Sequence, residues 1–478
     1  MARAQRRRGA TWIGAAALAV TVAACAGEKV RAPEVEAVRP PPFQVEYDGA
    51  AQFEGDFEKL GERRAVATKL RALASGGDRL LLEQSTWIDG GGAPPRVETT
   101  LVRGERVWRR TVEAGGDSGF VELSGNAAAD ARRFAELPWR ARAPLAGGTG
   151  ESDFQSEQWR AHPRLGDVLE KSRCARVKLV DGRPVASAIS FERFGDFDAQ
   201  SVELALAKAG AAPESARELE LPAGARASSA TGPAHAPPAA LAPLAAGVFV
   251  VEDPACPVRS LAVEFADQFL VLEAPGSSAT GERIVDALSA AHPGKPIRAI
   301  LFSHHHPRFC GGLRPFIAEG AAILTTPLDA SFVEAAVMRP FTLAPDRLAR
   351  RGGKLRIETF DQGRFFADAG QELLVLDLGA ASRHCDDYVV FWLPRARILF
   401  VGDLAWSGFE GGAPRVGPSG RALADFVAER KLDVATLVQA LRVVGGPAEM
   451  PWADWLRAVP PAAPAAPTVP ADRPAQNL

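Results

Sequence analysis

Hydrophobic and polar residues alternate over long stretches of the first half of the chain, a period typical of strands that bury one face. Residues 45–222 contain several such stretches separated by turn residues, and they predict a mostly antiparallel sheet. The predicted strands are Arg79–Ile88, Arg96–Val112, Phe120–Leu123, and a hairpin of Ala175–Val180 and Pro184–Glu192 around Asp181-Gly182-Arg183. The charged stretch Phe57–Leu73 has apolar residues at roughly helical spacing and predicts an early helix. We therefore expect a β-rich α+β domain over residues 45–222.

A different pattern governs residues 245–458, where short apolar runs alternate with segments of helical period. The predicted strands are Gly247–Glu252, Ser260–Phe265, Phe269–Glu273, Ile297–Phe302, Ala322–Thr325, Leu355–Phe360, Leu373–Leu378, Tyr388–Leu393 and Ile398–Val401. The predicted helices are Gly281–Ala291, Leu313–Gly320 and Asp425–Leu441. Strands that alternate with helices in this way predict an α/β domain built in layers.

Segments rich in Pro and Ala separate and flank these two regions. Residues 223–244 predict an interdomain linker, and residues 26–44 predict a spacer before the first folded region. Residues 459–478 have a composition typical of a disordered tail.

The first 25 residues have the pattern of an export signal, with a basic start at residues 3–8. The apolar stretch Trp12–Ala24 is too short to span a bilayer comfortably. It ends in Val22-Ala23-Ala24-Cys25, which resembles the lipobox of bacterial lipoproteins, whose cysteine becomes the lipidated first residue. We expect a lipid anchor at Cys25, the membrane as partner, and a location in the cell envelope, on the outer membrane. An ordinary cleaved signal peptide is the alternative.

Composition narrows the function classes. A chain of 478 residues with 47% hydrophobic residues is long and apolar enough for two or three packed domains. The net charge of −2 gives no electrostatic reason to expect a nucleic-acid partner. Beyond Cys25 there are four cysteines, at neither CxxC nor scaffold spacing, and we expect them to be buried thiols, although an export route permits disulfides. They are Cys174, Cys256, Cys310 and Cys385.

Three consecutive histidines follow the predicted strand Ile297–Phe302, in the sequence SHHHPRFCGG. Residues i and i+2 of an extended segment point to the same side, so His304 and His306 face one way and His305 the other. Pro307 favours an extended conformation at His306 as well. Two imidazoles side by side at a strand end could form half of a metal site. The alternative is a polar loop with a chance run of histidines, which would have the same sequence pattern.

Two later segments each place a candidate ligand beside the end of an apolar strand. They are GAASRHCDDYVVFWLP, which contains His384, and ILFVGDL, which contains Asp403. With the histidine run, their order resembles the metallo-β-lactamase fold superfamily over residues 245–458. The resemblance implies a four-layer α/β/β/α sandwich with metals at one edge of the paired sheets.

The resemblance also implies a ligand set. His304 and His306 match the first two histidines of the family pattern, His384 matches the third, and Asp403 matches its metal-bridging carboxylate. Three neutral imidazoles and a carboxylate make a sound site for one zinc ion, or for iron or manganese. A β-lactam substrate is not implied, because the fold serves thioesters, phosphodiesters, lactones and other compounds.

The chain departs from the family pattern where the second metal would be held. Arg308 stands in place of the pattern's Asp, Phe309 in place of its adjacent His, and no histidine follows His384, with Leu441 near the expected last position. One interpretation is a one-metal hydrolase in which Arg308 holds an anionic substrate group and Asp403 orients water. The other is a non-catalytic relative, with one metal or none, that acts as an envelope binding or scaffold protein, since a cation near the site weakens metal binding.

Other polar residues near these motifs have simpler interpretations. We expect Cys310 and Cys385 to be packing residues, although a substitute thiolate ligand is conceivable. We expect His305 to turn away from the metal. Asp386 and Asp387 either support a ligand histidine or form a solvated turn.

Overall fold

The computed structural model describes residues 42–54, 59, 62–75, 79–88, 94–113, 116–123, 125–139, 154–181, 183–194, 199–212, 237–410, 412–443, 445–447 and 449–461. The predicted export signal with Cys25 and the spacer up to residue 41 lie outside the described residues, as do residues 223–236 of the linker and 462–478 of the tail. None of the described helices combines the length and the apolar content needed to span a bilayer.

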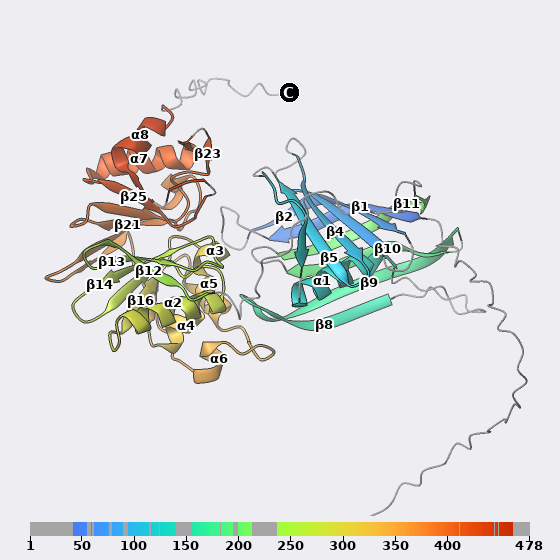
Figure 1. Cartoon of the computed structure of the whole chain (residues 1–478), viewed down its shortest axis with the longest axis horizontal. Coiled ribbons are helices and arrows are strands. Elements are labelled where there is room, and N and C mark those ends of the chain that lie inside the picture. The colour runs from blue at the N-terminus through green and yellow to red at the C-terminus, as the bar shows by residue number, and fades with distance from the viewer. Residues whose placement is uncertain are drawn as a thin grey trace, which may run out of the picture. The chain divides into compact units, whose positions relative to one another are not determined.

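The first region is a large sheet in which every neighbouring pair of strands is antiparallel, as predicted (Figure 1). Its strands are β1 (Phe43–Glu54), β2 (Arg63–Ala74), β3 (Arg79–Trp87), β4 (Arg96–Arg103), β5 (Arg106–Glu113), β6 (Gly116–Asp117), β7 (Val121–Leu123), β8 (Phe154–His162), β9 (Gly166–Val180), β10 (Arg183–Phe194) and β11 (Ala199–Ala211). They lie in the order β6-β5-β4-β3-β2-β1-β11-β10-β9-β8, and β7 pairs with β5. The predicted hairpin is β9–β10, with Arg183 opposite Val180.

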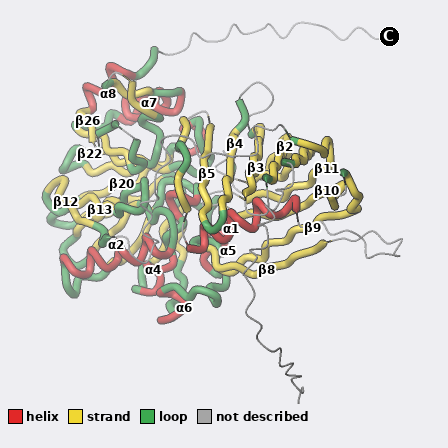
Figure 2. The backbone as a smooth tube through the Cα atoms, turned by 45° about the vertical axis from the view of Figure 1, so that its right-hand side comes forward, coloured by secondary structure: helices red, strands yellow, loops and turns green. Residues whose placement is uncertain are grey.

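One helix covers part of this sheet. Helix α1 (Gly125–Glu136) packs against β3, β4 and β5, and the 3-10 helix η1 (Leu137–Trp139) follows it (Figure 2). Ala131, Ala135 and Leu137 are buried in one core with strand residues such as Tyr47 and Phe191. Small alanines let the helix approach the sheet closely, and the face of the strands that it covers is apolar because it is buried there.

The predicted early helix over Phe57–Leu73 is wrong, because Arg63–Ala74 forms β2. Val66, Thr68, Leu70 and Ala72 are buried, and the residues between them face solvent. This period of two belongs to a strand. Alanines at both buried and exposed positions hid the alternation, since alanine fits either face.

Residues 240–458 contain two further main sheets and their helices. The first sheet consists of β12 (Ala240–Ala245), β13 (Val248–Glu252), β14 (Ser260–Glu264), β15 (Phe269–Leu272), β16 (Ile297–Leu301), β17 (Ala322–Thr325) and β18 (Ile357–Thr359) in chain order. The second consists of β19 (Gly363–Ala367), β20 (Glu372–Asp377), β21 (Val389–Leu393), β22 (Ile398–Val401), β25 (Thr436–Gln439) and β26 (Glu449–Pro451). A small ribbon pairs β23 (Gly408–Glu410) with β24 (Ala413–Arg415). The helices are α2 (Ser278–Ala291), α3 (Pro307–Cys310), α4 (Arg314–Ala318), α5 (Ala330–Val337), α6 (Arg347–Arg351), η4 (Gly379–Ser382), α7 (Pro418–Arg430) and α8 (Trp452–Ala458).

These elements form the predicted α/β/β/α sandwich (Figure 1). The central core joins the two sheets, with Leu301 and Leu324 from one and Phe391 and Phe400 from the other. A second core joins the first sheet to α2, α4 and α5, and a third joins the second sheet to α7 and α8. The parallel strands β15 and β17 are buried along their whole length, and β16 is buried except at Arg298, as their mostly apolar sequences require.

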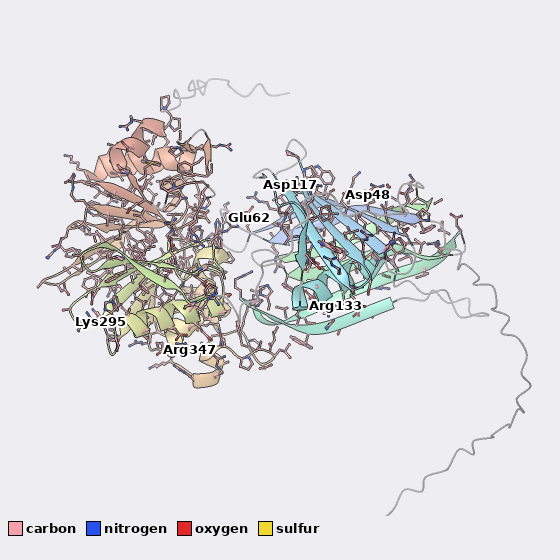
Figure 3. All side chains as sticks on the ribbon, in the orientation of Figure 1. Asp48, Glu62, Asp117, Arg133, Lys295 and Arg347 are labelled. Atoms are coloured by element: carbon pink, nitrogen blue, oxygen red, sulfur yellow. The ribbon has the colours of Figure 1, made fainter. Side chains whose placement is uncertain are left out.

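Ion pairs between charged side chains connect the helices on the outer face of the first sheet. Arg347, labelled in Figure 3, stands at the start of α6. Its side chain donates to Asp286 of α2 and to Glu319 after α4. Its side chain is largely buried, so the bonds bring three helices together while the charge remains paired.

Two predictions in this half need correction. Asp425–Leu441 is not one helix: α7 ends at Arg430, Lys431 takes a left-handed conformation with φ +53°, and Thr436–Gln439 is the buried strand β25. Pairing in parallel with β22 overrides the helical spacing there. Residues 240–244, expected in the linker, belong to the edge strand β12, which tolerates Pro243 because an edge needs no second set of hydrogen bonds.

Candidate metal centre

The histidine run lies at the carboxyl end of β16. The strand ends at Leu301, and α3 begins at Pro307. As predicted, His304 and His306 face the same side: His304 Nε2 lies 2.9 Å from His306 Nδ1. His305 turns the other way, and its Nδ1 lies 2.8 Å from Asp387 Oδ1. The period of two therefore correctly predicted which two histidine side chains lie on the same side.

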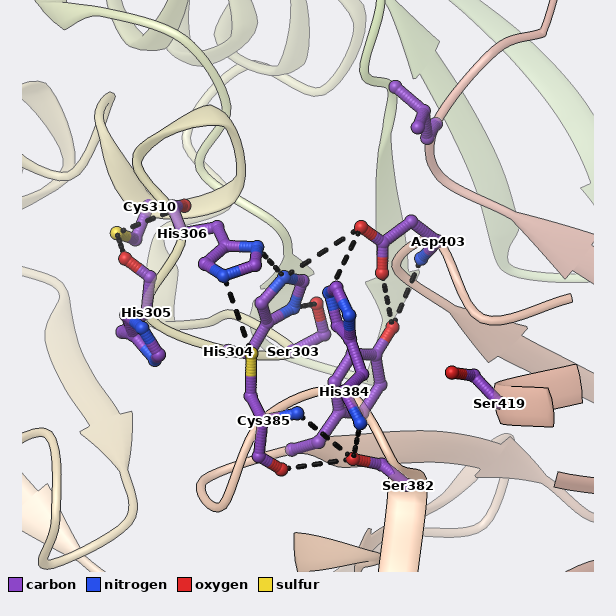
Figure 4. A network of polar contacts seen from close by, with 12 residues as sticks. Ser303, His304, His305, His306, Cys310, Ser382, His384, Cys385, Asp403 and Ser419 are labelled. Carbon is purple, nitrogen blue, oxygen red and sulfur yellow. Dashed lines mark hydrogen bonds and ion pairs between the residues drawn. The ribbon is translucent and has the colours of Figure 1, made fainter. Parts of the chain in front are cut away.

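His384 and Asp403 approach the same histidines from the second sheet (Figure 4). His384 precedes β21, in a loop that the Ser382 hydroxyl fixes by accepting the amides of His384 and Cys385 at 3.0 and 3.1 Å. Asp403 follows β22, and its Oδ2 lies 3.4 Å from His384 Nε2 and 3.9 Å from His304 Nε2. The four residues that the sequence nominated as ligands therefore lie together.

Tyr388 holds Asp403 in place. The Asp403 amide donates to the Tyr388 hydroxyl at 3.0 Å, and that hydroxyl donates to Asp403 Oδ1 at 3.3 Å. The Tyr388 ring also stacks on His304, with 4.6 Å between ring centroids. A side chain at Gly402 would collide with the hydroxyls of Tyr388 and Ser303, so glycine is needed for this close approach.

The electrostatics of the cluster favour a neutral imidazole beside an ionised carboxylate. Burial, followed by the neighbouring histidines and Arg308, holds the pKa of His304 well below its usual range. Burial opposes ionisation of Asp403, but the hydrogen bond and charge of His384, with His306 and Arg308, outweigh it and lower the pKa of the carboxyl. Neutral imidazole and carboxylate are the forms that bind metals.

A buried glutamate that sequence reasoning missed lies beneath the cluster. Glu273 Oε2 accepts the Ser303 amide at 3.1 Å, and Ser303 Oγ lies 2.8 Å from His304 Nδ1. Burial is the main reason why the pKa of Glu273 rises to about 8, with Asp403 contributing. Glu273 directly follows the apolar strand β15, and a lone acid at the end of a buried strand was the available signal.

The residues that depart from the family pattern surround the same cluster. Phe309 is fully buried, and its ring centroid lies 4.5 Å from that of His304. Arg308 is half-buried and close enough to lower the pKa of both His304 and Asp403. The Leu441 amide donates to the Gly402 carbonyl, so Leu441 lies beside the strand end that carries Asp403.

Asp387 does not support a ligand histidine. It is buried, and its carboxylate accepts the His305 amide at 2.7 Å besides approaching the His305 ring. Asp329 lies next to it, with the pKa of its carboxyl raised to about 8, mainly by burial and then by the Asp387 charge. Asp386 is exposed. One of the two adjacent acids is therefore structural, and the other faces solvent.

All four cysteines of the described part are buried thiols, as expected. Cys310 Sγ donates to the carbonyls of His305 and His306 at 3.3 and 3.5 Å. Cys385 Sγ lies 3.4 Å from His306 Nε2. Sequence reasoning favoured packing for Cys385, and the structure places its sulfur among the ligand nitrogens.

The donor set fits a metal ion. Ligand atoms of His304, His306, His384 and Cys385 all lie within 4.8 Å of one another. Ring nitrogens of His304 and His306 lie 2.9 Å apart, against roughly 3.3 Å for two nitrogens that share a tetrahedral ion at about 2.05 Å each, so the two rings are close enough to bind one ion through one nitrogen each. Ser303 Oγ can accept a hydrogen bond from His304 Nδ1–H and so leave His304 Nε2 free of a proton to bind an ion.

Comparisons with known proteins concern the same part of the chain. The model of the metallo-beta-lactamase superfamily matches residues 255–443, which contain the whole cluster. A metallo-beta-lactamase from Pontibacter korlensis is 19% identical over 46% of this chain and 95% of that chain, with a TM-score of 0.33. The metallo-beta-lactamase FIM-1 from Pseudomonas aeruginosa, in its mono-zinc form, is 16% identical over 47% and 95%, with a TM-score of 0.35. The sec-alkylsulfatase Pisa1 from Pseudomonas sp. is 16% identical over 46% and 40%, with a TM-score of 0.32. No curated protein gives a significant match.

Proposed function

The C-terminal half of the chain belongs to the metallo-beta-lactamase superfamily, and on that premise we propose that it is a hydrolase-type domain that uses a single metal ion. His304, His306 and His384 would hold the ion, and Asp403 would lie beside it. The observation that carries the proposal is the convergence of three imidazoles from two different sheets on one small buried volume. Packing alone gives no reason to gather three polar rings there.

A bound ion would act as a Lewis acid and would make a coordinated water more acidic. The chain's own residues supply the rest. Asp403, ionised and held by Tyr388, can accept a proton from a water beside His384. The His384 side chain is 28% exposed, whereas that of His304 is fully buried, so His384 marks the side from which solvent and substrate reach the cluster.

Arg308 would hold an anionic group of the substrate, such as a carboxylate or a phosphate. An arginine guanidinium offers a positive charge and paired donors to such groups. The effect of Arg308 on the pKa of both His304 and Asp403 supports a position near the reacting atoms. This assignment favours substrates that carry a negative charge next to the bond to be hydrolysed.

The three residues that would bind only a second metal in the family pattern are replaced in this chain. The Phe309 ring packs against His304, Arg308 supplies a positive charge, and Leu441 stands at the strand end where the last histidine is expected. A second ion would therefore meet one cation and two apolar side chains instead of three ligands.

Metal analysis of the purified protein tests the proposal. We expect about one zinc, iron or manganese ion per chain, lost in a His304→Ala/His384→Ala variant and retained in His292→Ala, a control histidine that packs on Phe269. A wild-type protein that takes up no metal after incubation with excess zinc, iron or manganese would refute the one-metal proposal.

Arg308 also supports a second candidate, a non-catalytic relative that binds or scaffolds in the envelope. A fixed positive charge that lowers the pKa of His304 opposes a metal cation as well as a proton. A metal-free wild-type protein with a stable fold would favour this candidate.

We further propose that the protein is anchored to the cell envelope through a lipid on Cys25, with the membrane as its partner. The support is the sequence Val22-Ala23-Ala24-Cys25 after a basic and apolar start. Fractionation and mass spectrometry test it: the wild-type protein should carry a lipid and sediment with membranes. A Cys25→Ser variant should lack the lipid, and lipid on that variant would disprove the assignment.

A further inference from the structure

One side of the histidine cluster carries a sulfur atom that the family pattern does not call for. Cys385 Sγ lies 3.4 Å from His306 Nε2, and the ligand atoms of His304, His306, His384 and Cys385 lie within 4.8 Å of one another. Cys385 is 2% exposed, so this sulfur meets protein atoms and not solvent.

The backbone aims two adjacent side chains at opposite sides of the cluster. Ser382 holds this segment: it accepts the amides of His384 and Cys385 and donates to the Cys385 carbonyl at 2.9 Å. From this fixed turn, His384 points toward Asp403 and Cys385 points toward His306 (Figure 4). Sulfur and carboxylate therefore flank the histidines from different directions.

We propose that Cys385 is the fourth protein donor of the metal centre, which makes it a three-histidine, one-thiolate site that water would enter as a fifth ligand. The proposal rests on the one-metal function above and specifies its coordination. On binding, the S–H bond breaks, the sulfur electron pair forms the metal–sulfur bond, and the proton passes to solvent; no electron is transferred. Thiolate is a soft ligand, so the site selects zinc and chemically similar ions such as cobalt over manganese or magnesium.

Burial favours a ligand over a nucleophile at this position. A nucleophilic cysteine must reach a substrate, and Cys385 is almost fully covered. Cys310 is a matched comparison, because it also lies within a few residues of a proposed ligand histidine, His306, and is also buried. Its sulfur, however, is directed to the carbonyls of His305 and His306 and away from ring nitrogens. Only Cys385 of this pair joins the group of ligand atoms.

Cobalt(II) gives the test, because a thiolate bound to cobalt produces a charge-transfer band in the near ultraviolet that imidazole and carboxylate do not. Wild-type protein and Cys310→Ser, loaded with one equivalent of cobalt, should both show this band. Cys385→Ser should keep the visible bands of bound cobalt, lose the ultraviolet band, and bind zinc at least about tenfold more weakly. Zinc binding should also release one proton fewer in Cys385→Ser than in wild type, measured in buffers of different ionisation enthalpy.

The outcomes separate this inference from the proposed function. Wild-type protein with visible cobalt bands but no thiolate band would overturn the role of Cys385 and leave the one-metal function standing. Wild-type protein that binds no cobalt would overturn both. If Cys385→Ser fails to fold, the wild-type spectrum and the Cys310→Ser control still decide the assignment.

Discussion

Glu273→Gln should remove a pH dependence of stability that the wild-type protein carries. Glu273 is fully buried directly after β15, in a left-handed conformation with φ +69°. Its Oε2 accepts the Ser303 amide, and within the described structure its Oε1 has no hydrogen-bond partner. Because burial disfavours the charged form and Asp403 adds a like charge, the pKa of the carboxyl rises from 4.5 to about 8.

The sign follows from proton binding. Between pH 4.5 and about 8 the unfolded chain has released this proton and the native protein still holds it, so native stability falls as pH rises through this range. Above about pH 8 the carboxyl is ionised in both the native and the unfolded chain. The loss in the free energy of unfolding then reaches its full value of about 3 to 5 kcal/mol, given 1.36 kcal/mol for each pH unit between the native and unfolded pKa of Glu273. Gln keeps the size and the acceptor for Ser303 but has no proton to lose.

Urea denaturation between pH 5 and pH 9 measures the difference. The stability of Glu273→Gln relative to wild type should increase steadily up to about pH 8 and then level off. Exposed Glu334→Gln serves as the control and should follow the wild-type profile. If wild type and Glu273→Gln show parallel profiles over this range, the carboxyl titrates normally and our account of its burial is wrong.

Three further substitutions test the site from other sides. Arg308→Asp should tighten zinc binding in calorimetry, since it replaces a cation near His304 with a potential ligand; unchanged or weaker binding would mean that the guanidinium does not act on the site. Phe309→Ala should lower the free energy of unfolding by about 3 to 5 kcal/mol because it removes a fully buried ring, and a loss below about 1 kcal/mol in urea denaturation would contradict that packing. Asp387→Asn should destabilise the protein by about 3 kcal/mol, because it removes the carboxylate that faces the His305 ring; wild-type melting behaviour would show that this buried pair is dispensable.

The strands of the sandwich were predictable because most are buried on both faces. Ala322–Thr325 and Ile398–Val401 were placed to the residue, since each is a continuous apolar run between polar turns. The secondary-structure predictions failed where the spacing of apolar residues did not match the position of the segment in the fold. In β2, alanines blur the two faces, and in β25 a short apolar run continues the helical spacing of α7. Only pairing with neighbours assigns such segments.

The residues of the candidate site also fall into those that the sequence predicted and those that it could not predict. His304, His306, His384 and Asp403 were nominated from motifs, because metal ligands are few residue types at fixed places on strands. The residues that hold these ligands in place match no sequence motif. Glu273 and Tyr388 act through burial and through hydrogen bonds to groups far away in the sequence, which only the folded chain brings together.

The charge of Arg308, which stands where the family pattern has a metal-binding Asp, bears on the proposed role of Cys385. Arg308 adds a positive charge beside the proposed metal position, and the three histidines would bind an ion as neutral ligands, so they would offset none of that charge. Asp403 alone would balance only one of the positive charges of the ion and Arg308. A thiolate at Cys385 adds a second negative charge in the same buried volume, on the side of the cluster away from Asp403. If Cys385 binds the ion as proposed, its thiolate would offset the positive charge that Arg308 adds to the cluster.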